Sequence, residues 1–291
     1  MTSHMALGPH APHPDGEPPP QELSEHHFQT RHLLEKDLGT LVVEASRQPK
    51  TNSFHAQQEL GLPFKSQSQE KLFSYLISMS PYLTRALRKV RRNGEKFEWT
   101  EGRAPYRLVF EKTIALPGMF NQEETTWNGP GLSNDQRTGM MIETLKELAH
   151  EIGHALTPEA LSAGSLGPEH FRTKADYVNA YVALAVRWEG DALYSELRVA
   201  EDLLRNGISM PVMRNTLYEQ SELQKIFNDK ALTKGEKRQM LGEIVRSTHD
   251  GFEANYPVYA AANWDRFIAA RRPIARLWHR LTTSLINDEL R

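Results

Sequence analysis

The chain has 291 residues, of which 39% are hydrophobic, and this length allows one large domain with a sizeable core. Its net charge of −2 gives no electrostatic reason to expect nucleic acid or an anionic membrane as a partner. The chain contains no cysteine, which excludes disulfides and thiolate metal ligands. It has neither an apolar run long enough to span a membrane nor an N-terminal signal peptide, so any export is expected to use another route.

The first part of the chain divides into a tail and a helical region. Residues 1–30 are rich in proline and histidine and have little to bury, so they are predicted to be a disordered tail or linker. Residues 31–291 are predicted to form a single domain. Apolar residues recur at helical spacing over Leu33–Val43 and Gln69–Val90, with a break at Ser80-Pro81. The arginines and lysines near residue 90 are expected to form the solvated side of the second helix.

Three short segments with alternating polarity follow and predict a small sheet. They are Phe97–Trp99, Tyr106–Phe110 and Thr113–Leu116, and Asn93-Gly94 supplies a turn before the first. The domain is therefore expected to be α+β and predominantly helical.

A histidine pair four residues apart is the most informative pattern in the sequence. His150-Glu151-Ile152-Gly153-His154 matches HExxH, and on an α-helix both imidazoles face the same side. Cap residues near Ser133 and a stop at Thr157-Pro158 support a helix over this stretch. Such a helix predicts a metal site in which His150 and His154 bind Zn²⁺ and Glu151 lies at its edge.

A second long helix is predicted from Thr173 to Arg205, and two acids interrupt its apolar stripe. Glu189 and Glu196 need a cation, a metal or strong hydrogen-bond donors, because burying an unpaired carboxylate is costly. Glu189 is the expected third ligand, with Glu196 either a hydrogen-bond acceptor behind a ligand or the ligand itself; Asp191 is a weaker candidate. Gly190 and Ala192 are small, which is expected to let this helix approach the metal closely.

Two histidines and one glutamate leave a position for water, which is typical of catalytic rather than structural zinc. The pattern predicts amide hydrolysis, with Glu151 accepting the proton of the water and passing it to the leaving amine. A donor for the oxyanion is also needed. The candidates are Tyr259, Tyr256 and His249, in that order, within a stretch from Ser247 to Tyr259 that is predicted to be a loop.

These residues resemble the gluzincin branch of the zincin metallopeptidases. More narrowly, residues 65–265 resemble HExxH effector metallopeptidases of bacterial type III and type VI secretion systems, including toxin domains attached to VgrG spike proteins. The resemblance lies in the order of parts: a helix pair, a short sheet, His150–Ala155, an Arg-x-Glu-Gly-acid-Ala segment at Arg187–Ala192, and a tyrosine-rich segment near Tyr256. Asp191 departs from this pattern, since a second glutamate is expected there.

The resemblance implies a zincin-like fold and a toxin that is delivered without a signal peptide into the periplasm or cytoplasm of a target cell. It also implies a peptide or protein substrate, a cognate immunity protein and a secretion-spike protein as partners. An edge strand within Tyr106–Leu116 is expected to pair with an extended substrate. Two alternatives remain open: a zinc amidase acting on peptidoglycan peptides, and a zincin-like binding module with a vestigial metal site.

Overall fold

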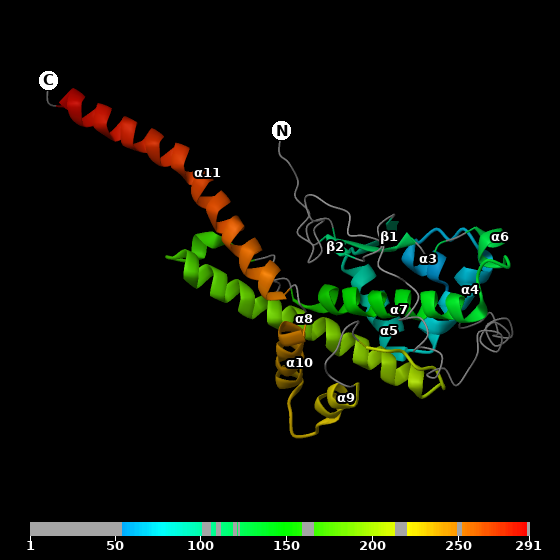
Figure 1. Ribbon diagram of the computed structural model, residues 1–291. Coiled ribbons are helices and arrows are strands. Elements are labelled where there is room, and N and C mark those ends of the chain that lie inside the picture. The colour runs from blue at the N-terminus through cyan, green and yellow to red at the C-terminus, as the bar shows by residue number, and fades with distance from the viewer. Residues whose placement is uncertain are drawn as a thin grey trace.

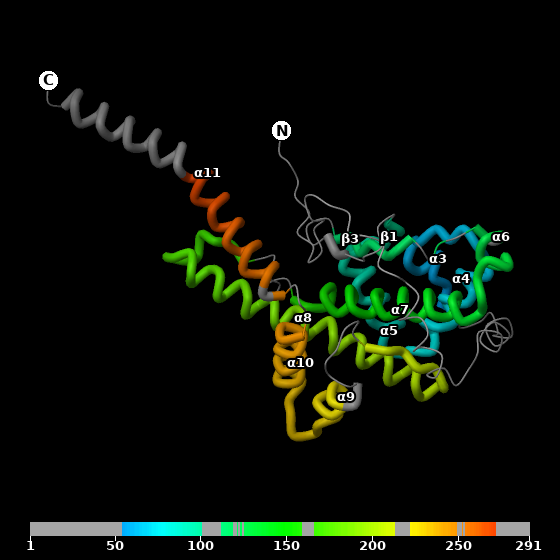
Figure 2. The backbone as a smooth tube through the Cα atoms, viewed as in Figure 1, coloured from blue at the N-terminus to red at the C-terminus, as the bar shows by residue number. Residues whose placement is uncertain are grey.

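A computed structural model describes residues 54–100, 106–108, 112–118, 121, 123–158, 166–212, 220–248 and 252–289. The described part is predominantly helical with one small sheet, as predicted (Figures 1 and 2). The predicted tail at residues 1–30, the helix at 33–43 and the candidate His249 lie outside the described residues. Among the described residues, no helix is long and apolar enough to cross a membrane.

The helices that precede the sheet form one wall of the core. They are α3 (Ala56–Leu60), α4 (Gln67–Ser78) and α5 (Pro81–Arg92). The break predicted at Ser80-Pro81 is confirmed, because the Ser80 side chain caps α5 by accepting from the backbone N–H of Leu83 and a proline occupies the first turn. The basic residues of α5 are exposed, as expected for its solvated side.

The sheet has three strands in the order β1-β3-β2. Strands β1 (Lys96–Thr100) and β3 (Thr113–Pro117) are parallel, with Phe97 opposite Ile114, and β2 (Tyr106–Leu108) pairs antiparallel with β3. Each predicted segment contains a strand, although residues 109 and 110 of the second segment lie outside the described residues. Within Tyr106–Leu116, however, only β2 is an edge, because β3 is buried in the centre of the sheet.

Helix α7 (Asn134–Leu156) carries the HExxH motif and follows the four-residue helix α6 (Glu124–Trp127). Ser133 begins α7 with a capping box: its hydroxyl accepts from the backbone N–H of Gln136, whose side chain accepts from the Ser133 N–H. The helix ends at Thr157, as predicted. Apolar residues of α7 face α4, α5 and β3, so the motif rests on the wall formed by the first half of the domain.

Helix α8 (Lys174–Leu204) runs through the middle of the described structure (Figure 1). It packs against α7 on one side and against α10 (Lys234–Thr248) and α11 (Phe252–Glu289) on others, while α9 (Gln220–Asn228) lies near α10. A short 3₁₀ helix, η5 (Pro168–His170), precedes α8. The prediction of one long helix is confirmed.

The prediction of a loop from Ser247 to Tyr259 is wrong. The segment includes the end of α10 and the first two turns of α11, which begins at Phe252. In the structure a proline lies inside the helix, and Phe252, Tyr256 and Ala260 are buried at helical spacing along its inner face.

Candidate metal centre

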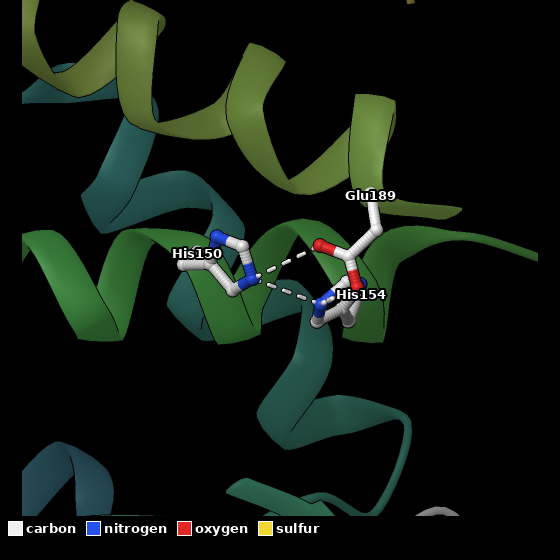
Figure 3. Close-up of side chains that lie close together, drawn as sticks. All are labelled: His150, His154 and Glu189. Atoms are coloured by element: carbon white, nitrogen blue, oxygen red, sulfur yellow. Dashed lines mark hydrogen bonds and ion pairs between the residues drawn. The ribbon is translucent and has the colours of Figure 1, made fainter. Parts of the chain in front are cut away.

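The two motif histidines meet through their Nε2 atoms. His150 and His154 lie one turn apart on α7, and their Nε2 atoms are 3.1 Å apart (Figure 3). The His154 ring is fully buried, whereas the His150 side chain is 22% exposed. The pair is therefore open to solvent on the His150 side.

Helix α8 brings Glu189 to the same point. Its Oε2 lies 3.5 Å from His150 Nε2 and its Oε1 3.9 Å from His154 Nε2. One ligand atom from each of the three residues lies within 4.8 Å of the others, so this group can hold a metal ion (Figure 3). Glu189 is 6% exposed, and the partners that the described structure gives it are the two histidines and Tyr256. No lysine or arginine of the described residues neutralises it.

A glycine in the motif allows α7 and α8 to approach this closely. A Cβ atom added to Gly153 would lie 2.4 Å from the Ala192 Cα and 2.7 Å from the Asp191 carbonyl oxygen. The expectation for Ala192 is thus met, but the one for Gly190 is wrong. Gly190 faces α10, where an added Cβ would lie 1.8 Å from the Arg238 carbonyl oxygen.

Glu196, the alternative ligand, lies behind His150. Its Oε1 is 2.7 Å from His150 Nδ1. An ionised carboxylate only accepts hydrogen bonds, so Nδ1 carries the proton and the lone pair of His150 is placed on Nε2, the atom that faces His154 and Glu189. The metal-binding group comprises His150, His154 and Glu189 and does not include Glu196.

The site attracts positive charge. Burial by itself lowers the pKa of His150, but the hydrogen bond and charge of Glu196, together with the charges of Glu189 and Glu151, outweigh this effect and raise it to about 10. Carboxylates that hold a proton on an imidazole also favour a divalent cation in its place. The donor set of two imidazoles and one carboxylate fits Zn²⁺.

Glu151 is 1% exposed and lies at the edge of this group, as its position in the motif predicts. Its charge acts on both His150 and Tyr256, which shows that it lies near the two.

The three oxyanion candidates have different surroundings. Tyr256 is buried on α11, and its hydroxyl donates a hydrogen bond to Glu189 Oε1. Burial and the nearby charge of Glu189 raise the pKa of Tyr256 well above 10, so the hydroxyl keeps its proton at neutral pH. Tyr259 lies almost one turn further along α11 and is half-buried, near Tyr181. His249 lies outside the described residues.

Sequence reasoning missed the contact of Trp188 with His154 and the structural role of Asp191. The Trp188 ring packs on His154 with ring centroids 3.9 Å apart. Asp191, which seemed a weak ligand candidate, accepts a hydrogen bond from the Thr157 hydroxyl at 2.7 Å, and the Arg238 Nε lies 2.9 Å from its other oxygen. The sequence alone does not predict these contacts, because they depend on how α7 and α10 pack on α8.

Comparison with known proteins gives no relative: no protein-family model, curated protein or solved structure matches the chain. The functional argument therefore depends on the geometry of the residues themselves.

Proposed function

We propose that the protein is a zinc metallopeptidase of the gluzincin type, with a zincin-like catalytic domain. The observation that supports this most strongly is the convergence of His150, His154 and Glu189 from two helices, with Glu151 directly after the first histidine. Two imidazole nitrogens and one carboxylate oxygen are a usual protein ligand set for catalytic zinc. The partly exposed side of His150 leaves a path to solvent.

In this proposal each side chain has one task. When bound, zinc acidifies a coordinated water and polarises the carbonyl of the substrate. Glu151 accepts a proton at its carboxylate and returns it to the leaving amine. Glu196 holds His150 through Nδ1, and Tyr256 holds Glu189 through Oε1.

The substrate class in this proposal is an extended peptide. β2 is an edge strand of the described sheet and contacts α7, so it lies beside the motif helix with one side that pairs with no other strand among the described residues. A peptide that adds to this edge would place a scissile bond near the histidines.

The test combines metal analysis with one isosteric substitution. About one zinc per chain is expected in the purified protein, and Glu151→Gln should keep this zinc while losing peptidase activity by a factor of roughly 100 to 10,000, because proton transfer is removed. Glu243→Gln, an exposed glutamate on α10, is the matched control and should retain activity. Stoichiometric zinc in a His150→Ala, His154→Ala variant, or a Glu151→Gln variant as active as the control, would contradict the proposal.

The resemblance to secretion-system effectors extends the proposal to a toxin delivered into a competitor or host cell. Expression of the wild type and Glu151→Gln in the cytoplasm and in the periplasm of a test bacterium would identify the compartment in which the activity is toxic. Digestion of purified sacculi beside a panel of proteins would separate a peptidase from an amidase acting on peptidoglycan peptides, since the same ligands serve both reactions.

A further inference from the structure

A second cluster of charged and aromatic residues lies on α8, on the side away from α7. Three aromatic rings form its base: Tyr82 from α5, Tyr194 from α8 and Phe227 from α9, with the Tyr194 and Phe227 ring centroids 5.2 Å apart. In Figure 1 the elements around it, α9 and α10, lie on the opposite side of α8 from the sheet. None of these rings touches the metal-binding group.

Cations surround these rings. The Lys234 Nζ lies 5.4 Å and the Arg238 guanidinium 5.3 Å from the centroid of Tyr194, so both can interact with its π-face. The Arg198 guanidinium lies 5.8 Å from the Tyr82 ring and 5.9 Å from the Phe227 ring. Three long side chains from two helices are thus gathered over one aromatic base.

The charges of this cluster do not balance. Arg238 pairs with Asp191 through Nε, and Arg198 pairs with Glu201 at 3.2 Å. Lys234 has no carboxylate partner among the described residues, and the same holds for Lys89, whose charge also acts on Lys234. Among the described residues, the three cations of the cluster are paired with two carboxylates, which leaves the positive charge of Lys234 unpaired, and Lys89 adds a further positive charge beside it.

The environment of Lys234 agrees with this imbalance. Burial, followed by the charge of Arg238, lowers its pKa; Asp191 opposes the effect, and Arg198 and Lys89 add to it. The charges that act on this ammonium are thus three cations and one carboxylate. A bound dianion would reverse this balance of charge around the ammonium.

We infer that Lys234, Arg198 and Arg238 form an anion-binding site for a phosphate group, either free inorganic phosphate or the phosphate of a small molecule. Lys234 has no carboxylate partner among the described residues and two guanidinium groups lie near it, and guanidinium and ammonium groups are the usual phosphate donors of proteins. The terminal nitrogens of Arg238 face no carboxylate among the described residues because Asp191 lies at Nε. Lys234 and Arg238 both lie close to the Tyr194 ring, which holds the two cations near each other. The site is separate from the metal centre, so it does not depend on the proposed peptidase activity.

Calorimetric titration of the full-length protein with inorganic phosphate tests the inference, with sodium chloride at equal ionic strength as the reference. Saturable binding is expected in the wild type, and Lys234→Ala should weaken it roughly tenfold or more, since one charge-assisted hydrogen bond is lost. Lys71→Ala removes an exposed lysine of the same charge on α4 and should leave binding unchanged. Arg238 is left intact because it also holds Asp191.

A parallel titration of Glu189→Ala separates this site from the metal centre, which could itself take phosphate. Binding retained in Glu189→Ala and lost in Lys234→Ala would support the inference whatever the outcome of the peptidase assays. Equal binding in wild type and Lys234→Ala, or no binding beyond the chloride reference, would overturn it. Titration with glucose 6-phosphate beside inorganic phosphate distinguishes a phosphorylated small molecule, which should bind more tightly, from the free anion.

Discussion

Two buried acids on α8, two residues apart, have opposite surroundings. Asp191 points toward α10 and the end of α7, where Arg238 supplies a permanent positive charge and Thr157 a hydroxyl. Glu189 points toward α7, where it meets His150, His154 and the hydroxyl of Tyr256. The first acid is neutralised by the protein itself, and the second meets only groups that are neutral or can become so.

This difference separates a structural carboxylate from one that is suited to an external cation. A buried acid with an arginine and a hydroxyl partner joins helices and needs nothing further. A buried acid beside two imidazole nitrogens favours a positive charge, and neutral imidazoles do not provide it. The raised pKa of His150 shows how strongly the site attracts a positive charge. The contrast therefore supports a metal at Glu189 and argues against one at Asp191.

The largest expected effect is the loss of metal binding in Glu189→Ala. Removal of a direct ligand should lower zinc affinity by far more than the ~10–100-fold expected when a residue behind a ligand is removed. Asp191→Asn should leave zinc affinity within about tenfold and instead lower the free energy of unfolding by about 1–3 kcal/mol, because Arg238 loses its charged partner. Chelator competition and urea denaturation of the two variants measure these quantities. A greater loss of zinc affinity in Asp191→Asn than in Glu189→Ala would reverse the comparison.

A smaller loss of affinity is expected in Glu196→Ala. This carboxylate contacts Nδ1 of His150 rather than the face shared by the three ligands, so its removal should cost ~10–100-fold in zinc affinity. The same chelator competition measures it. If Glu196→Ala loses more affinity than Glu189→Ala, the ligand assignment must be exchanged between the two acids while the pair of histidines stays.

The sequence predicts those features of the site that leave a pattern among neighbouring residues of the chain. The HExxH helix, its Ser133 cap and the length of α8 follow from spacing and cap residues, and the structure confirms them. Glu189, the expected third ligand, is the acid that lies with the two histidines, but spacing along α8 left Glu196 open because both acids lie on the same stripe and the position of α7 distinguishes them.

Other features depend on contacts between distant segments. Gly190 was expected to let α8 approach the metal, but it lies at the contact between α8 and α10. A glycine in a helix does not reveal which neighbouring helix approaches it, and α10 begins more than 40 residues later in the chain. The helical start of α11 is not evident from the sequence, because Pro257 disfavours a helix. Burial of Tyr256 beside Glu189 overrides this local preference.

Two glycines of α7 test how closely this helix must pack against α8 for Glu189 to reach the histidines. Gly153→Ala places a methyl group against the Ala192 backbone, so the helices must separate, and a loss of about 1–3 kcal/mol of stability is expected together with weaker zinc binding. Gly139→Ala lies on the same helix with no atom within 4 Å of the added Cβ, and should stabilise the protein by about 0.5–1 kcal/mol. Urea denaturation of both variants, with and without zinc, checks this pair. Equal stability of the two variants would mean that α7 and α8 are not in close contact at Gly153.

The smallest effect is expected in Tyr256→Phe, which removes only the hydroxyl on Glu189. Loss of this hydrogen bond should weaken zinc binding by roughly two- to tenfold, corresponding to about 0.5–1.5 kcal/mol, because the carboxylate keeps both histidines as neighbours. Tyr259→Phe is the control and should leave zinc affinity unchanged. Turnover measured at saturating zinc then separates two roles for Tyr256. If the hydroxyl only holds Glu189, turnover recovers once the metal is restored. If it also donates to the oxyanion of the substrate, turnover stays about 100-fold lower, because loss of such a donor acts on the transition state and not on the metal.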